Sequence, residues 1–251
     1  MKYILEISYK GTLYHGWQIQ KNAHTVQAEL NKAINTLLKT EIETFGSGRT
    51  DTGVHAKQQF VEFIYDDVID SKLFLFKLNA LLPKDIYVHH IYTAESNFSV
   101  RHDAIKRSYD YHISLVKNPF KQEICCFLFQ KSIDVDLMNS AAKVLLNYTD
   151  FQSFCKYHSD VDHYICTIYE AYWERENDDL IFHITANRFL RGMVRAIVGT
   201  LIEIGLRKIN ISDFEKIILE KDRKAAKYAV PPEGLFLTKV QYHPQALTLI
   251  S

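Results

Sequence analysis

An aspartate in a glycine-punctuated turn is the residue of this chain best placed to do chemistry. It lies in Gly46-Ser-Gly-Arg-Thr-Asp51-Thr-Gly-Val-His55, with Arg49 two positions before it and a hydroxyl side chain on either side. An ionised and positioned carboxylate can act as a nucleophile or as a general base. A neighbouring arginine favours the charged form of that carboxylate if the two side chains meet. The turn is therefore a candidate active-site loop.

The same residues allow two other interpretations. Glycines at 46, 48 and 53 permit backbone conformations that a side chain would forbid, so the main chain can approach a ligand. Asp51 can instead cap the turn through its own backbone, as Asp and Thr commonly do. Asp51-Thr52-Gly53 also matches the aspartic-protease motif, but a single copy would need a partner subunit for the second carboxylate of the dyad.

Six segments in order resemble the TruA-type tRNA pseudouridine synthases. Arg49-Thr-Asp51-Thr-Gly-Val-His55 resembles that family's Arg-Thr-Asp-Ala-Gly-Val-His, whose aspartate is catalytic. The other five segments that resemble the family span nearly the whole chain and are Tyr14-His-Gly16-Trp17-Gln18-Ile-Gln20, Leu78-Asn79-Ala-Leu-Leu82-Pro83-Lys-Asp85-Ile86, Phe98-Ser-Val-Arg101-His-Asp-Ala104-Ile-Lys-Arg107-Ser-Tyr109-Asp-Tyr111, Asn187-Arg-Phe189-Leu190-Arg-Gly-Met193-Val194-Arg195-Ala-Ile-Val198-Gly199 and Pro232-Glu233-Gly234-Leu235-Phe236-Leu237.

The resemblance implies an isomerase that converts uridine to pseudouridine at positions 38, 39 and 40 of the tRNA anticodon stem-loop. It implies Asp51 as the catalytic residue, with Arg195 placed against it and Tyr109 in contact with the target uracil. It also implies tRNA as partner, a homodimer, and no cofactor or metal. The remaining substrate-binding residues are expected to be Arg49, Arg101, Arg107 and Arg191. No motif decides whether Asp51 attacks the base, attacks the sugar or abstracts a sugar proton.

For Tyr109, a role in packing and a role in binding the substrate are both consistent with the sequence. Tyr109 and Tyr111 lie two apart in an expected strand and share a face with Arg107. An aromatic ring there can stack on an unstacked base, whereas most tyrosines pack in a core. We assign Tyr109 to the base and Tyr111 to packing. Val100 replaces the family's usual alanine beside Arg101, which can alter RNA contacts.

The order of expected elements indicates an α+β protein. Strands are expected at 2–9, 57–65, 86–93, 107–115, 164–174, 180–186 and 235–242. Helices are expected at 26–39, with Thr25 as its cap, and at 71–80, 135–147, 189–206 and 212–220. The resemblance implies the pseudouridine synthase fold, in which two α/β halves with antiparallel-rich sheets flanked by helices enclose the catalytic cleft. We place the halves at 1–95, with the aspartate loop, and 96–251, with the Tyr and Arg motifs.

The expected helix at 189–206 carries a further pattern. Arg188, Arg191 and Arg195 are spaced three and four apart, so they are predicted to form one stripe, while an apolar stripe faces elsewhere. This spacing would present guanidinium groups along one side of a helix whose other side packs.

Composition favours a cytosolic enzyme. The chain has 251 residues, of which 47% are apolar, and we find neither a membrane span nor a signal peptide. The 30 basic and 30 acidic residues cancel, so RNA binding would have to rely on local patches. The basic residues cluster at Lys106 and Arg107, at Arg188, Arg191 and Arg195, and at Lys221, Arg223, Lys224 and Lys227.

Two rival hypotheses stay open. The spacing of Cys155, His158, His163 and Cys166 resembles a small zinc site, although no paired Cys-x-x-Cys is present. The chain could also be a non-catalytic RNA-binding module or chaperone that keeps the fold without turnover. The joint presence of Arg49, Asp51, Tyr109 and Arg195 argues for catalysis.

Overall fold

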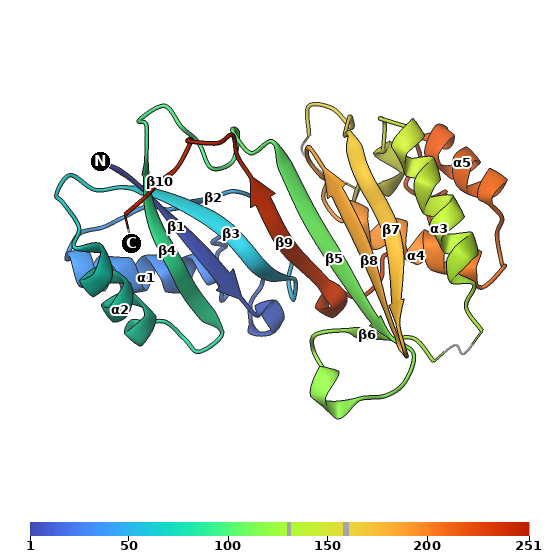
Figure 1. Cartoon of the computed structure of the whole chain (residues 1–251), viewed down its shortest axis with the longest axis horizontal. Helices are drawn as coiled ribbons and strands as arrows, with labels where there is room; N and C mark the ends of the chain where they lie inside the picture. The colour runs from blue at the N-terminus through green and yellow to red at the C-terminus, as the bar shows by residue number, and fades with distance from the viewer. Residues whose placement is uncertain (130–131, 158–160, 251) are drawn as a thin grey trace. The chain divides into compact units, whose positions relative to one another are not determined.

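The computed structural model divides the chain into two compact units. It describes residues 1–129, 132–157 and 161–250. The first unit comprises Met1–Ile105 and Phe236–Ser251, and the second comprises Lys106–Leu235. Each unit combines helices with a largely antiparallel set of strands (Figure 1), which confirms the α+β class. Among the described residues, no helix has the length and hydropathy needed to cross a membrane.

Five strands form the sheet of the first unit in the order β10-β4-β1-β3-β9. They are β1 (Lys2–Tyr9), β3 (His55–Ile64), β4 (Ile86–Ala94), β9 (Leu235–Gln241) and β10 (Thr248–Leu249). The short strand β2 (Phe45–Gly46) pairs with β3. All neighbours are antiparallel except β3 and β9, which run parallel. The expected strands near 2–9, 57–65, 86–93 and 235–242 are confirmed.

Two capped helices accompany this sheet. Thr25 accepts a hydrogen bond from Ala28 N at the start of α1 (Val26–Leu38), as predicted. Asp70 accepts one from Leu73 N at the start of α2 (Ser71–Leu81). The alternating side chains Tyr3, Leu5, Ile7 and Tyr9 of β1 are buried, as are the inward positions of both helices. Alternation on the strand and helical periodicity thus build one core.

The second unit has the strand order β5-β8-β7. These antiparallel strands are β5 (Lys106–Ser114), β8 (Asp179–Ala186) and β7 (Ile168–Glu176), and β6 (Cys126–Phe127) pairs in parallel with β5. The helices α3 (Val135–Val144), α4 (Met193–Gly205) and α5 (Ile211–Glu220) gather beside β7 and β8 (Figure 1). Most of α4 is buried, so it forms the centre of this core.

Three predicted boundaries are wrong. The helix expected from 189 begins at Met193, because Gly192 adopts a left-handed φ of 71° and a turn precedes it. Arg188 and Arg191 therefore lie before the helix, and the predicted stripe of three arginines does not exist. The strand expected from 164 begins at Ile168, and α3 ends at Val144 in a 3₁₀ turn over Leu145–Asn147.

The compact units also differ from the expected halves 1–95 and 96–251. Residues 96–105 and 236–251 both belong to the first unit. Strands β9 and β10 pair with β3 and β4, and Ile105 N donates to Gln241 O at 2.8 Å. Tyr242 Oη donates to Val100 O at 2.7 Å. Contacts that are distant in sequence therefore attach these segments to the first sheet.

Candidate active site

Asp51 lies in the loop of residues 47–54 between β2 and β3, here called the aspartate loop. Ser47 N donates to Phe60 O at 2.8 Å, and Val54 N donates to Asp51 O at 3.1 Å. The Asp51 side chain is half-buried. Short main-chain bonds at both ends of the loop thus define where its carboxylate emerges.

The Tyr14–Gln20 motif holds the aspartate loop from the amino-terminal side. Trp17 N donates to Thr50 O, and Gly53 N donates to Tyr14 O, both at 3.2 Å. Gly16 has a φ of 88°, and a Cβ atom there would lie 2.4 Å from Thr50 O. Only glycine satisfies both the left-handed conformation and this close approach. The motif is therefore a cradle for the loop.

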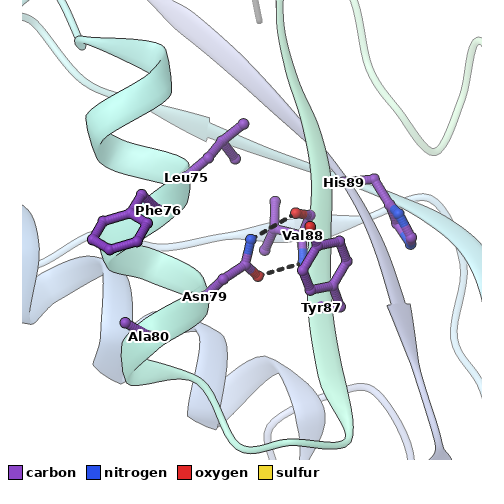
Figure 2. A pocket seen from close by; sticks show the side chains of 7 residues that line it. All are labelled: Leu75, Phe76, Asn79, Ala80, Tyr87, Val88 and His89. Atoms are coloured by element: carbon purple, nitrogen blue, oxygen red, sulfur yellow. Dashed lines mark hydrogen bonds between the residues drawn. The ribbon is translucent and has the colours of Figure 1, made fainter.

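The Leu78–Ile86 motif supports that cradle in turn. Tyr14 Oη donates to Asp85 Oδ1 at 2.6 Å, and burial together with this carboxylate raises the pKa of Tyr14 well above its usual value. Figure 2 shows Asn79 on α2 bridging to β4: Asn79 Oδ1 accepts from Val88 N at 2.8 Å, and Nδ2 donates to Val88 O at 2.9 Å. The hollow around Asn79 contains none of the predicted site residues.

The three glycines in and directly before the aspartate loop differ in whether the structure requires glycine there. Gly53 has a φ of 79°, and a Cβ at Gly46 would lie 2.6 Å from the Trp17 ring. Gly48 has neither a left-handed φ nor a neighbour within 4 Å of an added Cβ. The expectation that glycine provides a backbone conformation forbidden to other residues is therefore confirmed at Gly53 and wrong at Gly48, whereas Gly46 is explained by the close Trp17 ring.

Arg49 is exposed, and the structure gives no ion pair between it and Asp51, both of which it describes. The pairing that would keep Asp51 charged is thus not seen between these two side chains. Both predicted roles of Arg49, toward Asp51 and toward the substrate, stay predictions.

Arg101 is also exposed, and it belongs to the first unit. The main chain before it is fixed, because Val100 N donates to Glu62 Oε2 at 2.6 Å and Val100 O accepts from Tyr242. The Val100 side chain is fully buried. Val100 therefore packs inside the unit, and its effect on RNA contacts beside Arg101 stays a prediction.

The second unit carries Arg107 and Tyr109 on β5. The half-buried Tyr109 ring meets the Phe189 ring edge-on at a centroid distance of 5.1 Å. Arg107 Nη1 donates to Asn187 O at 3.1 Å. Tyr111 is fully buried and donates to Pro231 O at 2.8 Å, which confirms its packing role.

Arg195 is the only arginine of the predicted stripe that lies on α4. Its Nε donates to Val230 O at 2.7 Å, and its main-chain oxygen accepts from Val230 N at 3.2 Å. The side chain is half-buried. This double link fixes the stem of the guanidinium group.

Arg188 and Arg191 lie in the turn of residues 187–192, here called the arginine loop. Asn187 Oδ1 accepts from Thr167 N and from Arg188 N, both at 2.8 Å. Lys156 N donates to Arg191 O at 2.8 Å. Arg191 is exposed. The loop thus presents cations on a main chain that Asn187 organises.

The carboxy-terminal basic run has partners of its own. Lys221 Nζ lies 2.8 Å from Asp150 Oδ2. Arg223 Nη1 donates to the carbonyl oxygens of Ala226 and Lys227, each at 3.2 Å. Lys221 and Arg223 therefore form contacts with neighbouring groups of the protein.

The candidate zinc residues do not form a described ligand set. Cys155 and Cys166 are buried, and burial raises the pKa of Cys166 to about 11. His163 is exposed and lies 3.1 Å from Arg188 Nη1 through its Nε2 atom. His158 lies outside the described residues. Within the described parts of the chain, no three His, Cys, Asp or Glu side chains gather as metal ligands.

The predicted site residues thus divide between the units. Arg49, Asp51 and Arg101 belong to the first unit, and Arg107, Tyr109, Arg191 and Arg195 belong to the second. The sequence analysis missed the supporting side chains. Tyr14, Asn79 and Asp85 had a signal, since they stand in family-like motifs, whereas Tyr9 and Gln59, which contact the aspartate loop at Thr50 and Gly48, had none.

Comparisons with known proteins agree with this geometry. Residues 141–243 match the family model described as tRNA pseudouridine synthase. The tRNA pseudouridine synthase A of Bacteroides thetaiotaomicron is 43% identical over 96% of this chain and 90% of its own length. That of Bacteroides fragilis is 43% identical over 98% of both chains, and that of Bacillus subtilis is 40% identical over 94% of this chain and 97% of its own. This chain therefore belongs to the tRNA pseudouridine synthase family, which is a family of isomerases.

Proposed function

We propose that this protein converts uridine to pseudouridine at positions 38, 39 and 40 of the tRNA anticodon stem-loop. The observation that carries the proposal is the aspartate loop, in which the main chain around Asp51 is bound on both sides by other segments. A residue that only caps a turn would not need two further motifs to hold that turn in place. The relatives named above are tRNA pseudouridine synthases, which supports the same substrate.

The reaction is an internal rearrangement of uridine. The bond from C1′ to N1 breaks, the uracil turns, and a bond from C1′ to C5 forms. The C5 proton leaves to solvent and N1 gains a proton, so no electrons are exchanged and no cofactor is required. Asp51 begins this sequence, by attack on the base, attack on the sugar or removal of a sugar proton. Arg195 orients and stabilises its charge.

Access to Asp51 requires that the target uridine leaves the base stack. Extrusion costs a few kcal/mol and calls for a pocket that replaces the lost stacking. Tyr109 is the ring we assign to that role, and its edge-on contact with Phe189 fixes the orientation of the ring. Arg49, Arg101, Arg107 and Arg191 bind the RNA backbone. We further propose that the enzyme acts in the cytoplasm as a homodimer.

Release of tritium from tRNA labelled at uracil C5 tests the proposal. The wild type is expected to release tritium, and Asp51→Ala is expected to release none while binding the same tRNA. Asp136→Ala on α3 changes another acidic residue and should remain active. Transcripts with cytidine at positions 38, 39 and 40 should give no release.

Two outcomes would contradict parts of this proposal. Absence of release by a folded wild-type protein that still binds RNA would favour the non-catalytic module. Release from the cytidine-substituted transcripts would show that the target uridines lie elsewhere in tRNA.

A further inference from the structure

A buried chain of hydrogen bonds links the end of β1 to both sides of Arg49 in the aspartate loop. Thr50 Oγ1 lies 2.8 Å from Tyr9 Oη, and Tyr9 Oη donates to Gln59 Oε1 at 3.0 Å. Gln59 Nε2 donates to Gly48 O at 3.4 Å. The exposed fractions of Tyr9, Thr50 and Gln59 are 4%, 8% and 0%. Buried polar side chains that form hydrogen bonds with one another make their surroundings more rigid.

Each group in this network of hydrogen bonds has a defined role as donor or acceptor. Tyr9 has a single hydroxyl proton, which goes to the Gln59 amide oxygen, so the Thr50 hydroxyl donates to Tyr9 Oη. The Gln59 amide nitrogen is then the only part of that side chain able to donate to Gly48 O. A change of Tyr9 to phenylalanine would remove both the proton and the acceptor at the middle of the chain.

The surroundings are shaped around these side chains. The Tyr9 ring stacks with Trp17 at a centroid distance of 6.3 Å. A Cβ atom at Gly46 would lie 2.7 Å from Gln59 Nε2, so glycine there makes room for the amide. Trp17 N also donates to Thr50 O. Thr50 is thus held through both its hydroxyl and its carbonyl group.

We propose that Tyr9 and Gln59 are positioning residues of the synthase, which hold the main chain at Gly48 and Thr50 and thereby place the Asp51 carboxylate. This inference rests on the proposed catalytic role of Asp51. The network fixes the loop before Asp51, as the Gly53 and Val54 main-chain bonds fix it after. Misplacement of a catalytic group by about 1 Å can cost on the order of a hundredfold in rate.

Tyr3 offers a matched control for Tyr9. Both tyrosines lie on β1 and are almost fully buried. Tyr3 Oη donates to Asp67 O at 3.0 Å, accepts from Ile69 N at 3.2 Å and lies 3.5 Å from Met1 Sδ, so Tyr3→Phe likewise removes a buried hydroxyl group together with its hydrogen bonds. At about 3.3 Å per residue, the two positions lie roughly 20 Å apart.

The experiment measures kcat, KM, tRNA affinity and thermal midpoint for both variants. Tyr9→Phe is expected to lower kcat by about 10- to 100-fold, with KM and tRNA affinity within a factor of about two. Tyr3→Phe is expected to lose a similar amount of thermal stability and to keep kcat. Equal kcat values in the two variants, or a loss confined to KM, would overturn the proposal.

Thr50 provides a second test if Tyr9→Phe does not fold. Thr50→Val should lower kcat like Tyr9→Phe, and Thr50→Ser, which keeps the hydroxyl, should restore it. The double variant Tyr9→Phe/Thr50→Val should lose no more than Tyr9→Phe alone, because Tyr9→Phe already removes the bond that Thr50→Val removes. Additive losses would overturn the proposal.

Asp51→Ala separates this proposal from the proposed function. Activity that survives Asp51→Ala refutes the catalytic role of Asp51. Inactive Asp51→Ala beside fully active Tyr9→Phe refutes the positioning role alone.

Discussion

The aspartate loop and the arginine loop both carry predicted site residues, but their main chains are held in different ways. The aspartate loop is held by the buried side chains of Tyr9 and Gln59 and by main-chain bonds from the Tyr14–Gln20 motif, where Gly16 closely approaches Thr50 O. In the arginine loop, the Asn187 side chain and main-chain bonds to Thr167 and Lys156 hold a turn whose Arg191 is exposed. A group that must meet a reacting atom needs fixed coordinates, whereas cations that meet phosphates act over a longer range.

Glycine-to-alanine changes give the largest expected contrast between the cradle of the aspartate loop and the arginine loop. Gly16→Ala should destabilise the protein by about 3 kcal/mol or more, since the new Cβ adds strain and a clash with Thr50 O. Gly192→Ala should cost only about 1 to 2 kcal/mol, since its φ is left-handed but the nearest atom is 3.6 Å away. Urea unfolding measures both.

Gly48→Ala is the control within the aspartate loop. It should change the free energy of unfolding by less than about 0.5 kcal/mol, because nothing lies within 4 Å of the added atom. A loss at Gly48 as large as that at Gly16 would contradict the account of this loop.

Asn187 is the residue whose substitution should loosen the main chain of the arginine loop. Asn187→Ala removes the acceptor of two main-chain donors and should cost about 1 to 3 kcal/mol. Weaker tRNA binding should accompany it, while kcat at saturating tRNA should change little. Asn187→Asp keeps the acceptor and should lose less on both measures. If Asn187→Asp and Asn187→Ala are equally impaired, the two bonds do not hold this loop.

The exposed Arg191 of the arginine loop should contribute to tRNA binding through its charge. Arg191→Ala is expected to reduce the slope of log affinity against log salt by about 1, without a change in kcat. Arg175→Ala, at an exposed position of β7, should leave the slope unchanged. Identical slopes for the wild type and Arg191→Ala would exclude a phosphate contact by Arg191.

The smallest expected effect is a pH dependence in the sheet that supports the arginine loop. His183 Nδ1 lies 2.8 Å from Asp110 Oδ1, and this hydrogen bond raises the pKa of His183 above 6.5. The resulting stabilisation is complete below pH 6.5 and is lost as pH rises through the pKa of the folded state. The wild type should therefore be less stable to urea at pH 8.5 than at pH 6.

Asp110→Asn is the variant that isolates this pair. Without the carboxylate, the difference in unfolding free energy between pH 6 and pH 8.5 should shrink. An unchanged difference would assign the pH dependence to other groups.

Local patterns predicted most elements but not their connections. The alternation of apolar residues predicted β1, and Thr25 as a cap together with helical periodicity predicted α1. The start of α4 was missed because Leu190 is buried like a helical position, although Gly192 interrupts the helix. The Tyr9–Thr50 and Tyr9–Gln59 bonds join residues 41 and 50 positions apart. Such partners are decided by strand register, which no local window contains.

The return of β9 to the first sheet has a consequence for synthesis. Strand β9 pairs with β3, yet the ribosome makes it only after the entire second unit. Until then, His55 and Ala56 of β3 lack the strand they pair with, while β2 already covers Val61 and Glu62 on the same edge, and an unpaired edge segment invites association with other chains. The second unit is continuous in sequence and can be completed first. Maturation of the nascent chain should therefore run in the reverse order of translation, with the unit that bears Asp51 finished last.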